Sequence, residues 1–460
     1  MLSFPQETTY YVAYVAFNII LARHVNDIVQ EPYMDEPFHI PQAQAYCRGD
    51  WLVWDPKITT PPGLYILSVI LKRVFIMKCS TPMLRMTNLL LLALLPPILS
   101  HLLALKRRTN PPETLLAPTM ESIVISTFPI AWFFAFLYYT DLGSLVFVLL
   151  TIVTARKRMH WLAALLGFIS CTFRQTNIIW VLFALASSAI ARLHTPPSPA
   201  TPSSDKGTGA ALHNPPAHSS TFVDIFRAVQ SLIPLVPSLI YDTIPYLVLT
   251  MAFAVFVYLN EGLVLGDKSN HTIALHIPQI YYFFAFSSLF GLPVLISGEG
   301  GVVGLANDVR KRMKALTSLL LTGLIMVSVY FYTIHHPFLL SDNRHYTFYV
   351  WNRIYRFHPL VPLLLSPLYL ACFWAWHLRL RKQTLLEAIL FLSSLVIVLL
   401  PAPLLEPRYF LIPYILLRAQ VSEPSAVGLL AEGGWYALLN WVTMYVFLYK
   451  ERAGVGRFMW

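Results

Sequence analysis

Long runs of apolar residues recur from one end of this chain to the other, and short polar segments separate them. Runs of this kind are typical of helices that cross a bilayer, which requires about 20 residues. Several runs are shorter, so the pattern sets the number of crossings only to roughly 12–14. The predicted spans are 8–24, 84–105, 120–139, 142–155, 160–173, 176–192, 243–260, 276–297, 315–334, 358–377, 384–403, 408–419 and 434–449.

The stretch 62–78 is apolar but is interrupted by Lys72 and Arg73. If it crossed the membrane, two of the basic clusters described below would change sides. If it lies in the interface as an amphipathic helix, all four clusters share one face. We therefore expect an interfacial helix here, which leaves the acidic segments and the glycosylation sequence that begins at Asn270 on the opposite face.

Composition supports a membrane protein. The chain is 56% hydrophobic and 12% charged, with a mean hydropathy of +0.59, whereas soluble proteins are about 25% charged. The net charge of +10 does not indicate nucleic acid, because 13 of the 33 basic residues lie in four short clusters between apolar runs. Such clusters mark the cytoplasmic face. They are 106–108, 156–158, 310–314 and 379–382.

The four cysteines show neither a CxxC pair nor the spacing of metal ligands. We therefore predict no metal site and no disulfide framework, although a single Cys47–Cys79 bridge remains open. The first apolar run lacks a basic leader and a cleavage site, so we expect it to be retained as a span.

Residues 193–221 are rich in proline, serine and glycine and nearly free of large apolar residues. Such a segment cannot bury enough apolar surface to become ordered, so a disordered cytoplasmic loop is predicted. It would separate an N-terminal transmembrane half, 1–192, from a C-terminal half, 222–460. We find no internal repeat, which argues against a transporter built from inverted halves.

The polar segment between the first two predicted spans contains Asp35 and Glu36 side by side, followed by His39 and Gln42. Acidic residues at the edge of a membrane usually serve chemistry or transport. A carboxylate there can act as a general base toward a sugar hydroxyl. Alternatively, one of the pair caps a helix or pairs with an arginine. Pro37 predicts a loop at the pair, followed by a short helix from about Pro41 to Gly49.

Other polar residues are predicted on the same face. Trp54 and Asp55 could contact a sugar, although tryptophan is more often an interfacial anchor at this depth. Asp141 contacts a substrate or merely begins a helix, and Arg174 is either a snorkelling anchor or a phosphate ligand.

The segment 341–353 gathers polar and aromatic residues after a predicted span, within a lumenal loop at 335–357. Arg344 and His345 could donate to phosphate oxygens, whereas Asp342 and Asn343 could bind sugar hydroxyls. The alternative is a polar connector without a function. Glu406 and Arg408 place an acid and a base together at a later junction, and that pair could be simply structural.

These motifs resemble the dolichyl-phosphate-glucose-dependent alpha-1,2-glucosyltransferases, which belong to the GT-C glycosyltransferases. The resemblance covers nearly the whole chain and is carried, in order, by MDEPFHIPQAQAYC, WDPKITTPPGLY, FLYYTDLGS, FRQTNIIWV, LLSDNRHYTFYVW, EPRYFLIPY and RFMW. It departs at Pro37, where the family is expected to have an apolar residue, and residues 193–221 match nothing.

The resemblance implies an all-α polytopic GT-C bundle in the endoplasmic reticulum membrane, with its active site in lumenal loops, the first at about 25–62. It implies transfer of the terminal glucose from dolichyl-phosphate glucose to a dolichyl-diphosphate-linked oligosaccharide in N-glycan precursor assembly. The reaction would be an inverting single displacement without cofactor or metal. The alternatives are a GT-C mannosyltransferase, which uses dolichyl-phosphate mannose, and, less favoured, a membrane transporter.

On this reading Asp35 is the base and Glu36 the runner-up. Arg344, His345 and Arg174 bind the donor phosphate. The residues assigned to the sugar or the acceptor are His39, Gln42, Trp54, Asp55, Asp141, Asp342, Asn343 and Tyr346.

Overall fold

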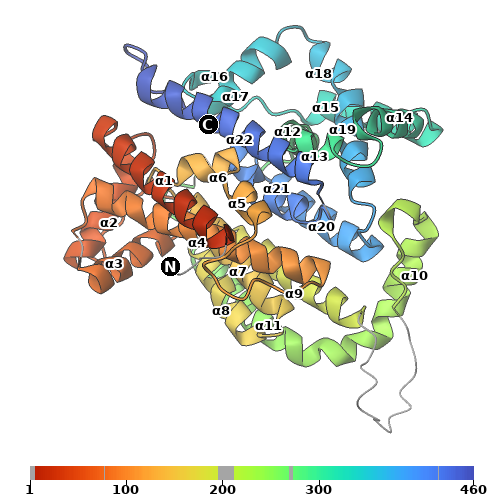
Figure 1. The fold of residues 1–460 in the computed structure, drawn as a ribbon, viewed down its shortest axis with the longest axis horizontal. Coiled ribbons are helices and arrows are strands. Elements are labelled where there is room, and N and C mark those ends of the chain that lie inside the picture. The colour runs from red at the N-terminus through yellow and green to blue at the C-terminus, as the bar shows by residue number, and fades with distance from the viewer. Residues whose placement is uncertain (1–5, 77, 195–211, 269–272, 423) are drawn as a thin grey trace.

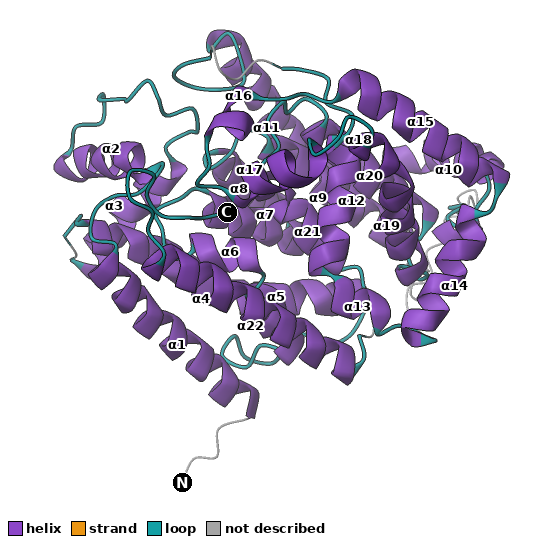
Figure 2. Cartoon of the chain, turned by 90° about the horizontal axis from the view of Figure 1, so that it is seen from above, coloured by secondary structure: helices purple, strands orange, loops and turns teal. Residues whose placement is uncertain are grey.

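The computed structural model describes residues 6–76, 78–194, 212–268, 273–422 and 424–460. Its regular elements in those ranges are all helices (Figures 1 and 2). The N-terminal half contains α1 (Gln6–Ile28), α2 (Glu36–Arg48), α3 (Gly63–Phe75), α4 (Thr81–Arg107), α5 (Met120–Ser126), α6 (Pro129–Phe134), α7 (Asp141–Arg156), α8 (His160–Cys171) and α9 (Asn177–Leu193).

The C-terminal half is also helical, with more interruptions. Its helices are α10 (Phe222–Leu232), α11 (Ile240–Leu259), α12 (Gln279–Phe290), α13 (Leu292–Ile296), α14 (Gly301–Met313), α15 (Leu316–Tyr332), α16 (Pro337–Ser341), α17 (Tyr346–Val350), α18 (Val361–Leu364), α19 (Ser366–Arg379), α20 (Leu385–Leu399), α21 (Leu411–Arg418) and α22 (Ala426–Tyr449). Short 3₁₀ or π turns are η1 (Ala217–Ser219), η2 (Ile233–Leu239), η3 (Trp351–Tyr355) and η4 (Pro407–Phe410).

Among the described residues, three helical stretches are long and apolar enough to cross a membrane: Thr81–Arg107, Phe222–Leu259 and Val361–Arg379. A fourth is obtained if α14 and α15, which are bent by 82° relative to each other, count as one broken span. Most other predicted spans correspond to shorter or interrupted apolar helices. The fold is therefore that of an all-helical polytopic membrane protein, and the expected 12–14 crossings exceed those that length and composition alone identify.

Proline explains one interruption that the apolar pattern did not reveal. The run 120–139 was expected as one helix, but α5 ends at Ser126 and α6 starts at Phe128–Pro129. A proline is accommodated in the first turn of a new helix, where no backbone donor is needed. The chain after α6 is irregular up to Thr140, and this buried irregular stretch lies beside the candidate site.

The four basic clusters lie at one end of the molecule, as predicted. Lys106 lies 3.8 Å from Glu387 at the start of α20, and Arg156 donates to the Leu105 carbonyl. Arg312 donates to the His218 carbonyl, and the His218 ring hydrogen-bonds to the Arg381 carbonyl. Because α7 runs from Asp141 to Arg156 and α4 from Thr81 to Arg107, the acidic segments lie at the opposite ends of these helices.

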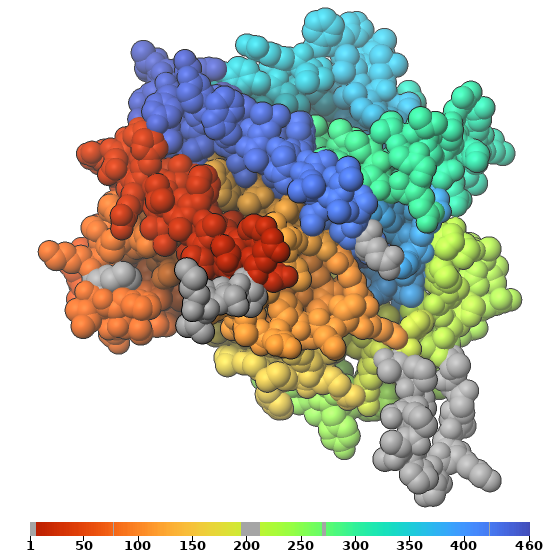
Figure 3. All heavy atoms as spheres, in the orientation of Figure 1, coloured from red at the N-terminus to blue at the C-terminus, as the bar shows by residue number. Residues whose placement is uncertain are grey.

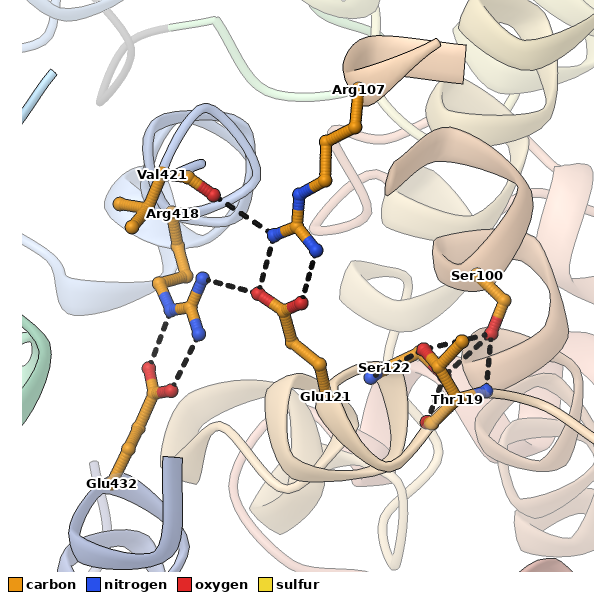
Figure 4. Close-up of polar contacts among 8 residues, drawn as sticks. All are labelled: Ser100, Arg107, Thr119, Glu121, Ser122, Arg418, Val421 and Glu432. Atoms are coloured by element: carbon orange, nitrogen blue, oxygen red, sulfur yellow. Dashed lines mark hydrogen bonds and ion pairs between the residues drawn. The ribbon is translucent and has the colours of Figure 1, made fainter. Parts of the chain in front are cut away.

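A buried ion-pair network joins the two halves near the basic end (Figure 4). Arg418 of α21 binds Glu432 of α22 at 2.7 and 2.8 Å, and it also reaches Glu121 of α5 at 2.9 Å. Arg107 of α4 binds the same Glu121 through two hydrogen bonds. Because Arg418 and Glu432 are completely buried, removing either partner would leave an uncompensated charge in the interior.

The structure also bears on two segments for which the sequence predicted no membrane crossing, 62–78 and 193–221. Within the stretch 62–78, expected as an interfacial helix, Gly63–Phe75 form α3, whose 13 residues extend only about 20 Å, too short to cross a bilayer. Part of the segment 193–221, expected as a disordered loop, is ordered: Asn214 accepts from the Leu386 backbone and donates to Thr384. This asparagine satisfies the first turn of α20, which the composition of the segment could not indicate. Residues 195–211 lie outside the described residues.

Candidate active site around Asp35

Helix α2 begins at the acidic pair, which corrects the expected loop. Asp35 is the N-cap and Glu36 the first helical residue. Pro37 occupies the first turn, where a missing N–H costs nothing, and the helix continues through Pro41. It ends where predicted, because Gly49 adopts φ 100°, a left-handed conformation that glycine tolerates. From the start of the helix the two carboxylates point in different directions, Glu36 into the protein and Asp35 toward the surface.

Glu36 points into the protein and is completely buried. Its carboxylate forms a bidentate pair with Arg85 of α4, at 2.8 and 2.6 Å. It also accepts from the backbone N–H groups of Tyr33 and Tyr138. Four hydrogen bonds occupy the lone pairs of both oxygens, so the side chain joins α2, α4 and the irregular stretch after α6.

Asp35 is different, because its side chain is 41% exposed. Its Oδ2 lies 3.1 Å from a guanidinium nitrogen of Arg408, in η4, and its backbone N–H donates to the Tyr139 hydroxyl at 3.1 Å. Burial acts to raise the pKa of Asp35, but the charge and hydrogen bond of Arg408 outweigh it, so the pKa lies below its usual value. Asp35 is thus an ionised, accessible carboxylate.

Arg408 is held from several sides. It binds Glu406 and lies 3.6 Å from Asp141, which begins α7. Its guanidinium lies over the Tyr139 ring, 5.2 Å from the ring centroid, a favourable cation–π geometry. Arg174, just before α9, binds Asp141 at 2.6 Å. The arrangement brings two arginines and three carboxylates from separate segments into one cluster.

Of the remaining predicted residues in the first acidic segment, His39 lies one turn beyond Asp35 and hydrogen-bonds to Tyr65. Burial lowers its pKa although the neighbouring Asp35 opposes that shift, so its imidazole is neutral at about pH 7. Gln42 is buried and its amide holds the loop through Val53 and Asp55.

Asp55 and Trp54, which follow in the same loop, make contacts that stabilise its conformation. Asp55 accepts from the Lys57 backbone, which forms a tight turn. The Trp54 ring packs edge-on against Tyr65, 6.2 Å between centroids.

A disulfide joins Cys47, near the end of α2, to Cys79, just before α4. This is the pairing that the sequence left open. Lys72 donates to the Cys47 carbonyl and Gln44 to the Cys79 carbonyl, so α3 is tied to the bridge as well. The bridge closes the segment that follows α2 and contains Trp54 and Asp55.

The predicted phosphate-binding loop is organised by its own acid and by the C-terminal segment. Asp342 accepts two hydrogen bonds from the Arg344 guanidinium, at 2.8 and 2.7 Å. His345 bonds to the Trp460 carbonyl, and Met459 pairs with the backbone on both sides of His345. The Tyr346 ring packs edge-on against Phe458, 4.5 Å between centroids.

This loop lies within electrostatic reach of the first acidic segment. Burial raises the pKa of Asp35, whereas Arg408, His39 and then His345 act to lower it. A polar pocket of about 540 Å³ opens between residues 338–344 and the turn at Gly454 and Val455, and Asn343 lines it. The structure therefore places the Arg344–His345 segment near the Asp35–Glu36 segment, although about 300 residues separate the two in the sequence.

Two residues that matter for this geometry were not chosen from the sequence. Arg408 was noted only as one half of a pair that could be structural, although its position at a junction on the acidic face was a signal. Arg85 was overlooked inside an apolar run, although ionisable residues in such runs are rare and usually face a partner. Among the described residues, no group of three His, Cys, Asp or Glu side chains could hold a metal ion.

The arrangement suits transfer of a group from an anionic leaving group. An accessible ionised carboxylate can accept a proton, and arginines beside it can neutralise a departing phosphate. The bonds within the cluster hold these groups in position before any substrate arrives.

The chain is similar to known proteins over most of its length. Residues 29–419 match the model of the DIE2/ALG10 family. A protein from Rattus norvegicus is 37% identical over 94% of both chains, and one from Arabidopsis thaliana is 33% identical over 95% of this chain and 96% of its own. Both are named Dol-P-Glc:Glc(2)Man(9)GlcNAc(2)-PP-Dol alpha-1,2-glucosyltransferase. No solved structure gives a significant match. The extent of the family match and of these identities shows that the chain belongs to the DIE2/ALG10 family.

Proposed function

We propose that this protein is an inverting hexosyltransferase that transfers glucose from dolichyl-phosphate glucose to Glc(2)Man(9)GlcNAc(2) on dolichyl diphosphate, forming an alpha-1,2 linkage. The relatives are named for that activity and align with this chain over nearly their full length. The product would be the completed lipid-linked precursor for N-glycosylation.

The proposed location is the endoplasmic reticulum membrane, with the Asp35 cluster on the lumenal face. The basic clusters gather at the other end of the molecule, as cytoplasmic segments do. The Cys47–Cys79 disulfide belongs to the Asp35 side, and disulfides persist in the oxidising lumen but not in the cytosol. Cysteines introduced at Asp50 and Lys314 should be labelled from opposite sides of sealed vesicles.

The base that we propose is Asp35, and the observation that carries the proposal is the contrast between the paired acids. Asp35 is partly exposed and ionised, whereas Glu36 is buried with its four acceptor positions occupied. In a single displacement, Asp35 would take the proton from the acceptor hydroxyl as the oxygen attacks the anomeric carbon of the donor. The bond to the phosphate breaks on the opposite side of the sugar, which inverts the configuration. Glu36 would keep the loop in place.

The developing charge on the leaving phosphate requires cations, and Arg408 is the closest one to Asp35. We propose that Arg408 and Arg174 act on the phosphate together with Arg344 and His345 from the second loop. Binding would exchange part of the carboxylate contacts of these arginines for phosphate oxygens. The residues that remain proposals for contacts with the sugar or the acceptor are His39, Trp54, Asp141, Asp342, Asn343 and Tyr346. Gln42 and Asp55 would support the loop.

The function is tested by transfer in proteoliposomes with purified protein and the diglucosylated acceptor. Dolichyl-phosphate glucose should support transfer and dolichyl-phosphate mannose should not, whereas transfer of mannose alone would make the protein a mannosyltransferase. Asp35→Asn should abolish most of the transfer. The matched control is Asp50→Asn, because Asp50 is an exposed acid of the same segment that pairs with the exposed Arg48. Retained transfer in EDTA would support the prediction that no metal takes part.

A further inference from the structure

A groove of about 440 Å³ runs between α1 and α22. Figure 3 shows α1 (red) and α22 (blue) side by side on one face of the molecule, as does the ribbon in Figure 1. The walls are apolar, with Phe17 and Leu21 on α1 and Trp441 and Tyr445 on α22. The floor is formed by α5 and α6, including Trp132. Aromatic residues on both rims are exposed, Phe17 by 57% and Trp441 by 65%. Exposed apolar surface of this kind is suited to contact with hydrocarbon.

The groove runs from the end of the molecule that carries the basic clusters toward the end that carries the candidate site. At one end Gly433 adjoins Glu432, a member of the buried ion-pair network near the basic clusters. At the other end the His24 ring hydrogen-bonds to the Tyr449 hydroxyl across the groove. The first end therefore faces the proposed cytoplasmic side and the second end the proposed lumenal side.

Both walls continue into the candidate site. On α1, two residues past His24, Asn26 accepts from Arg85, which holds Glu36. On α22, Phe447 packs against the Tyr33 ring at 5.8 Å, and Tyr33 is two residues from Asp35. The lumenal end of the groove thus borders the loop that carries the proposed base.

We infer that this groove holds the polyisoprenoid chain of the lipid-phosphate sugar donor, with the chain leaving the groove past His24 and Tyr449 toward the cations proposed above to bind its phosphate. This inference rests on the proposed function and adds the position of the donor lipid. An isoprenoid chain provides only apolar contacts, which the walls and floor satisfy. Lys450, beside Tyr449, adds a positive charge at the end through which the phosphorylated end of the chain would leave the groove.

The chemistry of the two substrates favours the donor over the acceptor. In the donor, one sugar and one phosphate separate the reacting carbon from the lipid, so its chain must start close to the base. The acceptor named in the relatives has two glucoses, nine mannoses and two N-acetylglucosamines before its diphosphate. Its lipid therefore has no need to lie beside Asp35.

The test fills the groove and varies the chain length of the donor. Ala437 lines the groove on α22, and its neighbour Leu438 is exposed on the same helix but does not line it. Ala437→Trp should raise the KM for dolichyl-phosphate glucose about tenfold, which corresponds to about 1.4 kcal/mol of lost binding. The KM for a two-isoprene donor analogue and the KM for the acceptor should not change. Leu438→Trp should leave all three KM values unchanged.

The outcomes separate the inference from the proposed function. If the unmodified protein does not transfer glucose at all, the proposed function fails. If it does, and Ala437→Trp raises the acceptor KM alone, or the KM values for both donors equally, the groove does not hold the donor chain.

A second measurement needs no variant. A benzophenone-bearing polyprenyl-phosphate glucose should crosslink to peptides of α1 and α22 in the intact protein, and unlabelled dolichyl phosphate should compete. Crosslinks confined to other helices, or crosslinks that dolichyl phosphate does not reduce, would overturn the inference.

Discussion

Asp35 and Arg408 are separated by 373 residues in the sequence, yet a carboxylate oxygen of one lies 3.1 Å from a guanidinium nitrogen of the other. The contact joins the first acidic segment to η4, near the end of the C-terminal half. Because Arg408 is also bound by Glu406 and lies near Asp141, its guanidinium is held in position beside Asp35. The proposed active site is therefore preorganised around this pair.

The first prediction concerns the base. Asp35→Asn keeps the shape of the side chain but cannot accept a proton, so kcat should fall by about 10²–10⁴-fold. Donor binding, measured with radiolabelled dolichyl-phosphate glucose, should change little. An Asp35→Asn enzyme with kcat near that of the unmodified protein would exclude Asp35 as the base.

The second prediction concerns Glu36, whose expected contribution is to stability. Glu36→Gln would leave the Arg85 charge buried without its counter-charge, and breaking such a pair costs about 3–5 kcal/mol. The midpoint of thermal unfolding in detergent should fall clearly. Asp50→Asn, which breaks an exposed pair with Arg48, should cost less than about 1 kcal/mol. Equal unfolding midpoints for the two variants would contradict the structural assignment.

The third prediction follows from the low pKa of Asp35. Burial raises that pKa, and Arg408 more than compensates by favouring the ionised form. Arg408→Gln removes the compensating charge and leaves the burial, so the pKa must rise. The acid limb of the pH profile of kcat/KM should move to higher pH by about one unit or more. A lower kcat/KM with an unmoved acid limb would mean that Arg408 does not control the ionisation of Asp35.

The fourth prediction concerns Arg344, which offers two nitrogens on one planar group. Lysine carries the same charge but cannot reproduce a bidentate contact with phosphate. Arg344→Lys should therefore lower kcat by about 10²-fold in the transfer assay. The control is Arg353→Lys in the same segment, where the side chain lies over the Tyr349 ring. Near-normal turnover in Arg344→Ala would remove Arg344 from the mechanism.

The fifth prediction concerns the disulfide between Cys47 and Cys79. Replacing both cysteines with serine should reduce stability by about 2–4 kcal/mol, because the loop between them becomes free in the unfolded chain. Replacing the free Cys372 with serine provides a comparison. Peptide mapping without reductant should recover the linked pair, and alkylation of both thiols in the native protein would disprove the bridge.

Much of the fold follows from the order of residues alone. The apolar runs determine that helices form and that these helices lie in a membrane. Only lipid can cover so many apolar side chains, and in lipid a helix satisfies its own backbone hydrogen bonds. The basic clusters determine which ends of these helices share a face, and the structure brings the four clusters together. The end of α2 at Gly49 was also predictable, because glycine is the residue that tolerates the left-handed conformation there.

Which of two adjacent acids faces solvent was decided only by tertiary structure. Asp35 and Glu36 are equivalent by sequence position, and both were candidates for the base. Arg85, 49 residues from Glu36, draws that carboxylate into the interior, because a buried arginine requires a counter-charge. Asp35 is left at the surface beside Arg408, in a contact that joins the two ends of the chain. Local patterns determine helices and their polarity, whereas partners so distant in the chain meet only when the helices pack.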